Sequence, residues 1–260
     1  MKNVIYVMGA LLILLGACGS PEKIEVTVNP DIIPASVGFN FDASDSAAVA
    51  LADSVAIHAG GKRALDTANF IHFNFFGARD IYWDRINDIV KIVSKRTDFK
   101  AIYNLKSDTG KIFVNGELQS DLDSLKKYKD VARAIWINDT YWLLFPYKLK
   151  DSGVTLKYVG LGQDKADNAS HILQLTFQDV GETPENKYLA YVNADSYRIT
   201  QWDYFANATD SVPAIVTPWL DYKNYNGLWL SADRGKYKIP FIEVYSELDT
   251  ATYNAIYKTF

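Results

Sequence analysis

The spacing of apolar residues first predicts a helix from about Asp45 to His58. Apolar side chains recur at intervals of three and four at Val49, Ala52, Val55 and Ala56, which places them on one helical face. Asp45 or Ser46 can cap its start. Gly60-Gly61 can end it, because glycine accepts the left-handed conformation that follows many helices.

A second, longer helix is predicted from Ser120 or Asp121 onward. Its apolar side consists of Leu122, Leu125, Tyr128, Ala132, Ile135 and Trp136, and charged residues lie between them. We expect this helix to end at Asn138-Asp139, a pair suited to turns and helix ends.

Alternating apolar and polar positions predict about ten strands. They include Asn69–Phe76, Phe99–Leu105, Val154–Gly160, His171–Phe177, Tyr197–Phe205 and Ala214–Tyr222. Both faces of Asn69–Phe76 are largely apolar, so we expect it to be covered on both sides. Short turn signals such as Asn115-Gly116 connect the strands as an antiparallel meander. The predicted class is therefore α+β.

The stretch from Asn138 to Tyr158 holds the densest apolar run. Six of the seven residues from Tyr141 to Tyr147 are aromatic or aliphatic, and the seventh is Pro146. A run of this kind between a helix and a sheet is either the plug of the core or the mouth of an apolar cavity, and both alternatives stay open.

The N-terminus has the pattern of a bacterial lipoprotein signal. Lys2 precedes the apolar run Val4–Leu15, which is shorter than the ~20 residues of a membrane span. Leu15-Gly16-Ala17-Cys18 then resembles a lipobox. An ordinary secretory signal followed by an unrelated cysteine is the alternative.

This pattern predicts a signal peptide at residues 1–17, a lipidated Cys18 with a tether at residues 18–44, and one domain at residues 45–260. The acyl anchor makes the membrane a partner. Gly19 follows the cysteine, and by resemblance to enteric sorting rules this favours the outer membrane. The periplasmic and surface faces of that membrane both stay open.

Composition argues against nucleic acid as a partner and against sites built from cysteine pairs. The net charge is −4 and no long run of Lys or Arg occurs, so nucleic acid is not an expected partner. Cys18 is the only cysteine, so the chain has no second thiol with which to form a disulfide or a cysteine metal site.

Catalytic motifs do not stand out. The sequence has no Gly-x-Ser-x-Gly elbow and no Gly-rich phosphate loop. His58, His72 and His171 are far apart, and a metal site would require the fold to gather them. Asp203, between Trp202 and Tyr204, is the best single candidate for a perturbed carboxylate, although it also fits the polar half of a strand. We therefore predict no catalytic residue, no cofactor and no metal.

Aromatic residues are the remaining candidates. They make up 14% of the chain, and they favour strands. The candidate ligand-binding set is Trp136, Tyr141, Trp142, Phe145, Tyr147, Trp202, Tyr204, Trp219 and Tyr222. Its alternative is an ordinary packed core.

The chain also resembles a known family. The motifs that carry the resemblance are His58-Ala59-Gly60-Gly61, Ile137-Asn138-Asp139-Thr140-Tyr141-Trp142, Pro146-Tyr147-Lys148-Leu149, Asp151-Ser152-Gly153-Val154, Trp202-Asp203-Tyr204 and Asp221-Tyr222. They look like those of uncharacterised envelope lipoproteins of Gram-negative bacteria, whose architecture is similar to the LolA/LolB-like lipoprotein-localisation carriers. The resemblance implies a strongly curved antiparallel sheet, an open half-barrel of about ten strands with two main helices on its concave side.

Three functions are compatible with these patterns. The first is a lipid-anchored envelope protein that binds a lipid or another apolar ligand in the half-barrel. The second is a structural or protein-interaction lipoprotein with a packed core and an unspecified protein partner. The third is a hydrolase with an unrecognised histidine or carboxylate site.

Overall fold

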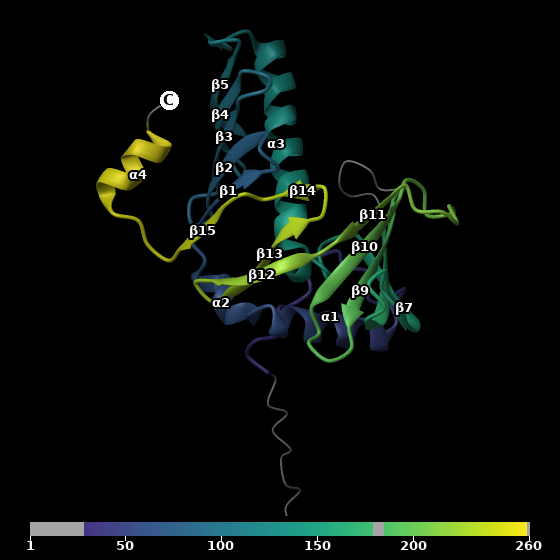
Figure 1. Ribbon diagram of the computed structural model, residues 1–260. Coiled ribbons are helices and arrows are strands. Elements are labelled where there is room, and N and C mark those ends of the chain that lie inside the picture. The colour runs from purple at the N-terminus through teal and green to yellow at the C-terminus, as the bar shows by residue number, and fades with distance from the viewer. Residues whose placement is uncertain (1–28, 179–184, 259–260) are drawn as a thin grey trace, which may run out of the picture.

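The computed structural model describes residues 29–178 and 185–258, and its strands form three antiparallel sheets (Figure 1). The predicted signal peptide and Cys18 lie outside the described residues, so both stay predictions. The α+β class and the antiparallel pairing are confirmed. The single half-barrel is wrong, since the strands divide into sheets of seven, five and three, none of them strongly curled.

The seven-stranded sheet has the order β15-β1-β2-β3-β4-β5-β6. Its strands are β1 (Phe70–Phe75), β2 (Arg79–Asp84), β3 (Ile89–Ser94), β4 (Phe99–Asn104), β5 (Thr109–Val114), β6 (Glu117–Leu118) and β15 (Ile242–Tyr245). The first six follow one another in sequence as a meander, and β15 adds to the β1 edge from the far end of the chain.

The five-stranded sheet is a second meander, with the order β11-β10-β9-β8-β7, and a three-stranded sheet follows it. The five strands are β7 (Val154–Gln163), β8 (Ala169–Phe177), β9 (Lys187–Asn193), β10 (Ile199–Phe205) and β11 (Ile215–Pro218). The three strands are β12 (Leu220–Tyr225), β13 (Leu228–Arg234) and β14 (Tyr237–Lys238).

Four α-helices occur in the described part of the chain: α1 (Ser46–His58), α2 (Gly61–Thr67), α3 (Leu122–Leu144) and α4 (Thr250–Tyr257), together with the short 3-10 helix η1 (Phe145–Tyr147). In that part, none of the helices has both the length and the apolar character needed to cross a membrane.

Two breaks explain why the strands do not form one sheet. The 23-residue helix α3 separates β6 from β7, so the two meanders cannot pair through consecutive strands. The predicted strand Ala214–Tyr222 is also divided. It leaves the five-stranded sheet at Pro218, which has no N–H to donate, and it resumes at Leu220 in the three-stranded sheet.

Helix α3 begins as predicted but continues past Asn138-Asp139. Asp121 caps it by accepting a hydrogen bond from the Ser124 N–H at 2.9 Å. Asp139 does not turn the chain, because Arg79 of β2 holds its carboxylate by two hydrogen bonds of 2.7 Å each. The side chain that suggested a helix end is therefore occupied by a tertiary ion pair, and the helix runs on to Leu144.

The start of the described chain packs on the domain. Phe39 is only 6% exposed, and backbone hydrogen bonds join Ser36 to Lys150 and Asn40 to Val154. Residues 29–44 are therefore not a free spacer. The tether interpretation stays a prediction for residues 18–28, which lie outside the described residues.

Two helices were not predicted. The seven residues of α2 are too few to show a helical period, and the Thr and Tyr residues of α4 favour strands by propensity. Asp249 nevertheless caps α4 by accepting hydrogen bonds from the backbone of Ala251 and Thr252. Gly60 connects α1 to α2 with φ +125°, and a Cβ there would clash with the Gly227 carbonyl oxygen.

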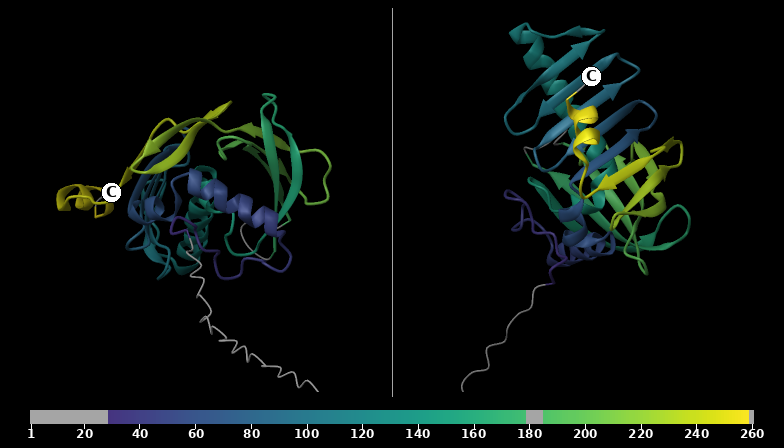
Figure 2. Two further views of the ribbon diagram at one scale, coloured as in Figure 1. Left: turned by 90° about the horizontal axis from the view of Figure 1, so that it is seen from below. Right: turned by 90° about the vertical axis from the view of Figure 1, so that its left-hand side faces the viewer.

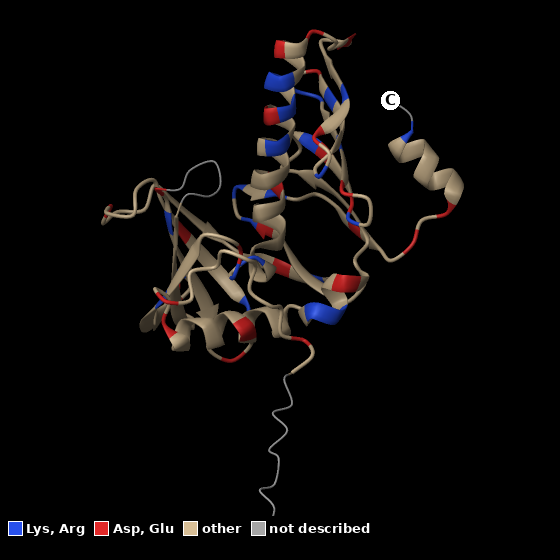
Figure 3. Ribbon diagram, turned by 180° about the vertical axis from the view of Figure 1, so that it is seen from behind, with Lys and Arg blue, Asp and Glu red and all other residues tan. Residues whose placement is uncertain are grey.

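The core has two parts. One lies between the seven-stranded sheet and α3, with Ile71, Phe73, Ile92, Ile112 and Leu143 at 1% exposure or less. The other joins α1, the end of α3 and the five-stranded sheet (Figure 2). Charged residues gather on the first half of α3, whereas its second half contacts both cores (Figure 3).

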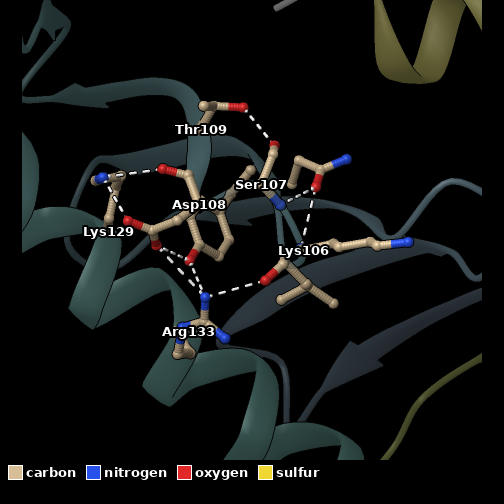
Figure 4. Close-up of polar contacts among 9 residues, drawn as sticks. Lys106, Ser107, Asp108, Thr109, Lys129 and Arg133 are labelled. Carbon is tan, nitrogen blue, oxygen red and sulfur yellow. Dashed lines mark hydrogen bonds and ion pairs between the residues drawn. The ribbon is translucent and has the colours of Figure 1, made fainter.

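A polar clasp holds α3 to the loop between β4 and β5 (Figure 4). The ammonium of Lys129 donates to the carboxylate of Asp108 at 2.7 Å and to its carbonyl at 2.9 Å. Tyr103 also donates to this carboxylate, and Arg133 donates to the Tyr103 hydroxyl at 2.5 Å. These groups satisfy one another, so we interpret the clasp as structural.

We expect the clasp to weaken in acid. Hydrogen bonds from Lys129 and Tyr103 lower the pKa of Asp108 from 3.8 to about 2. A carboxyl with a lowered pKa stabilises the fold above its ordinary value, and this contribution is lost as the pH falls from about 4 towards 2. Urea unfolding between pH 2 and 6 should show a flatter acid limb for Asp108→Asn, whose residue tolerates the φ of 55° at this position. An unchanged acid limb would contradict the role of the clasp.

Candidate functional site

The end of α3 brings several predicted rings together with the five-stranded sheet. Tyr141 and Trp142 of α3 and Phe145 of η1 face Tyr188 of β9, Trp202 of β10, and Trp219, which lies between β11 and β12. We call these six residues the α3 aromatic cluster. Five of them belong to the ligand-binding set predicted from the sequence, and Tyr188 does not; ligand binding by these residues stays a prediction.

Trp202 lies at the centre of the cluster and is 1% exposed. Its ring centroid is 4.5 Å from that of Trp142, 5.0 Å from those of Phe145 and Tyr188, and 5.2 Å from that of Trp219. Most of these pairs are edge-to-face or tilted, the arrangement that aromatic quadrupoles favour. The rings are thus in mutual contact.

Local structure explains why these residues meet. Tyr141 and Phe145 are four positions apart, so the helical turn at the end of α3 places both rings on one side. Trp202 points inward from β10, where it pairs with Ala190 of β9. The small Ala190 side chain leaves the indole room beside it.

Four buried nitrogen or hydroxyl groups in and beside the cluster have no hydrogen-bond partner among the described residues. They are the Tyr141 hydroxyl, the indole Nε1 atoms of Trp202 and Trp219, and Nε of Arg234. Burial raises the pKa of Tyr141 well above its ordinary value, so its hydroxyl keeps its proton. All four groups can therefore donate, and an unpartnered buried donor costs about 1–3 kcal/mol.

Arg234 of β13 was not predicted as a site residue. It is 2% exposed, its guanidinium carbon lies 3.5 Å from the centroid of the Trp219 ring, and it donates to the carbonyl of Trp142 at 2.8 Å. Among the ion pairs of residues 29–178 and 185–258, none includes this arginine. Burial lowers the pKa of Arg234 to about 9, so it still carries a charge at neutral pH.

The sequence position of Arg234 explains why its burial was not predicted. It precedes Gly235, the start of a turn, where a surface cation would be ordinary. The carboxylate of its neighbour Asp233 is bonded to Lys238 at 2.9 Å instead. Only the tertiary fold reveals that this cation is buried.

The other predicted rings lie elsewhere. Trp136 packs edge-on against Trp83 in the core beneath the seven-stranded sheet, at 5.2 Å. Tyr147 donates to the carbonyl of Ala59, Tyr204 accepts from Asn186 at 2.9 Å, and Tyr222 donates to the carbonyl of Ile199 at 2.8 Å. These contacts give the three tyrosines structural roles, and their place in a ligand site stays a prediction.

The histidines are only partly gathered. His58 and His171 stack on the ring of Tyr197 at 4.8 and 6.3 Å, whereas His72 belongs to the seven-stranded sheet. Within the described ranges, no group of three or more His, Cys, Asp or Glu side chains is placed to hold a metal.

Asp203 has the raised pKa expected of a perturbed carboxylate. Burial raises the pKa of this carboxyl, although hydrogen bonds from Gln201 at 2.8 Å and Tyr191 at 3.1 Å oppose the shift. Both partners are neutral, and no nucleophile is found among the contacts that Asp203 makes with described residues. These two bonds satisfy the buried carboxylate of a strand residue, and they do not form a pair of titratable groups for acid–base catalysis.

Comparison with known proteins gives similarity of structure only. No protein-family model matches the chain, and no curated protein matches it. Among solved structures, it is similar to a DUF1329 family protein from Desulfovibrio piger, with 11% identity, a TM-score of 0.42, and coverage of 80% of this chain and 98% of that one. It is also similar to a domain named for outer membrane lipoprotein sorting from Vibrio parahaemolyticus, with 8% identity, a TM-score of 0.39, and coverage of 79% and 95%.

Proposed function

We propose that this chain is a lipid-anchored protein of the cell envelope that binds an acidic amphiphile in the α3 aromatic cluster. The observation that carries the proposal is the set of four buried donors without acceptors among the described residues, one of them on a buried arginine. The anchor and the outer membrane location rest on the lipobox-like sequence before Cys18.

The unpartnered donors indicate which head group the ligand should have. Buried polar groups in native proteins nearly always have partners, so a set of donors alone favours a ligand rich in acceptor oxygens. Arg234 adds a positive charge with no carboxylate bonded to it in the described part of the chain, which favours an anionic head such as a carboxylate or a phosphate.

The aromatic rings indicate that the tail of the ligand should be apolar. Tyr141, Trp142 and Phe145 offer apolar faces beside the donors, and Tyr141 and Trp142 are only partly buried. Because the rings contact one another, a tail enters only when these two side chains separate from Trp202. Binding should therefore alter tryptophan fluorescence.

Titration of the full chain with dodecanoate tests the proposal. A Cys18→Ser variant avoids the acyl anchor and the detergent that it would require. We expect saturable tryptophan quenching by dodecanoate, with the neutral dodecanol bound about tenfold or more weakly, since hydrogen bonds to charged groups contribute about 1.5–3 kcal/mol. Equal binding of both probes, or no saturable binding, would count against the proposal.

Arg234→Met identifies the site. It should remove the preference for dodecanoate over dodecanol. The matched control is Arg198→Met, since the guanidinium of Arg198 lies over another indole, that of Trp229, at 4.1 Å. If both variants keep the preference, the head binds elsewhere.

A structural or protein-interaction role is the second candidate, and the mutual contact of the six rings favours it. A filled core needs no ligand. In-cell cross-linking of the anchored protein should then yield one dominant protein partner, and an organic extract of the purified protein should contain no stoichiometric lipid beyond the anchor.

A further inference from the structure

A cavity lies beneath α4, on the side of the seven-stranded sheet that faces away from α3. Its volume is about 330 Å³, within the range of small-molecule sites. Helix α4 crosses the sheet face that points away from α3 (Figures 1 and 2). The cavity is thus separate from the α3 aromatic cluster, and a ligand bound in it would be independent of the amphiphile proposed for that cluster.

The strand register builds the floor of the cavity. Phe70 of β1 pairs with Tyr245 of β15, and His72 pairs with Glu243 of β15 and Tyr82 of β2. Residues two apart on a strand share a face, so all five side chains lie on the same side of the sheet. This is the second apolar face that the sequence of β1 predicted.

Helix α4 closes one side. Tyr253 packs edge-on against Phe70 at 6.2 Å, and Tyr257 is buried against the sheet. The segment that leads into α4 contributes Glu247 and Asp249 to the lining. The carboxylate of Asp249 is fixed in place as the helix cap.

The lining combines aromatic faces with negative charge. It contains the rings of Phe70, Tyr82, Tyr245 and Tyr257 and the carboxylates of Glu243, Glu247 and Asp249, and no Lys or Arg is among the lining residues that the structure describes. Burial lowers the pKa of His72, so this histidine is neutral at pH 7 and adds no positive charge to balance the carboxylates.

His72 is oriented within the cavity. Its ring stacks on Tyr82 at 3.7 Å, and Nδ1 lies 3.0 Å from the carboxylate of Glu243. Lys91 approaches the ring of Tyr82 to 5.9 Å, but its ammonium is bonded to the Ile256 carbonyl at 2.7 Å. Ile256 is a lining residue near the end of α4, whereas Lys91 itself is not among the described lining residues.

We infer that this cavity binds a small organic ammonium compound, held between aromatic rings and carboxylates. Cations are attracted to the faces of aromatic rings, and quaternary ammonium groups are commonly recognised by cages of such rings. Three carboxylates repel an anion, and a neutral ligand of equal shape would gain nothing from them.

Choline and 3,3-dimethylbutan-1-ol provide the test, because the second is a neutral molecule of nearly the same shape. Calorimetric titration of the full-length Cys18→Ser chain should show saturable choline binding. The neutral isostere should bind about tenfold more weakly, as expected from loss of the cation–π and charge terms. No saturable choline binding, or equal binding of the two compounds, would overturn the inference.

Variants locate the site. Tyr245→Leu and Glu247→Gln should each weaken choline binding about fivefold or more. Tyr237→Leu is the matched control, because Tyr237 is a similarly exposed tyrosine on β14 that stacks on Phe76 and does not line the cavity. Circular dichroism and melting temperature verify folding of each variant. Unchanged binding in both cavity variants, or an equal loss in the control, would refute this location.

Discussion

Replacing Arg79 with methionine should lower the free energy of unfolding by about 3–5 kcal/mol. The carboxylate of Asp139 is fully buried in the C-terminal part of α3, and Arg79 provides two hydrogen bonds of 2.7 Å to it. Without the guanidinium, Asn138 is the remaining described side-chain donor, at 2.9 Å. Urea unfolding at pH 7 measures the loss.

The loss should shrink in acid. Burial raises the pKa of Asp139, and Arg79 and Asn138 oppose this shift, so removing Arg79 raises the pKa further. A carboxyl whose pKa is higher in the folded state stabilises the fold below its ordinary value near 3.8, and this contribution is lost as the pH rises through the folded value. The Arg79→Met deficit should therefore be largest near neutral pH and smallest near pH 4.

The double variant Arg79→Met/Asp139→Asn is the control. It removes the charge that the single variant leaves buried, and it should recover a large part of the lost stability. A single variant that costs less than about 1 kcal/mol, or a double variant that is worse than the single, would contradict a stabilising pair.

Replacing Trp202 with alanine should cost about 3–5 kcal/mol. Its indole contacts all five other rings of the α3 aromatic cluster, and the cavity left behind would lie between α3 and the five-stranded sheet. Thermal and urea unfolding both measure the effect, and the melting temperature should fall accordingly.

Trp202→Phe distinguishes the stability contributed by the volume of the ring from any contribution of its Nε1 atom. The Nε1 atom has no partner among the described residues, so phenylalanine loses volume but no hydrogen bond, and it should cost about 1–2 kcal/mol. Trp229→Ala, at a half-buried indole of β13, should cost less than Trp202→Ala. Equal costs for the two tryptophans would contradict the central position of Trp202.

The sequence was sufficient for elements with a local signal. Helix α1, the start of α3 and most strands follow from apolar period and capping residues, as Asp121 illustrates. It was insufficient where tertiary contacts prevail. The ion pair with Arg79 places Asp139 inside the helix, although its sequence suggested a helix end. Pro218 indicates a strand edge, but the apolar pattern around it does not show that the chain passes into another sheet.

The candidate site was likewise predictable only where the local sequence carries a signal. Tyr141, Trp142, Phe145, Trp202 and Trp219 stand out because large rings are concentrated in three segments of the sequence. Arg234 carries the charge on which the proposed ligand depends, and it stands beside a turn glycine in an unremarkable local sequence. Burial of this cation depends on its contacts with Trp142 of α3 and with Trp219, and a local sequence pattern does not contain that information.

Strand β15 has a consequence for the order of folding. One of the two strands that pair with β1 is β2, which follows it directly in the sequence. The other is β15 (Ile242–Tyr245), which is synthesised about 170 residues later. Until then β1 is an edge strand with unpaired backbone groups and the apolar ring of Phe70 beside them. A nascent or prematurely terminated chain that lacks its last twenty or so residues would expose this unpaired edge, so chaperones and proteases would encounter the incomplete chain first at β1.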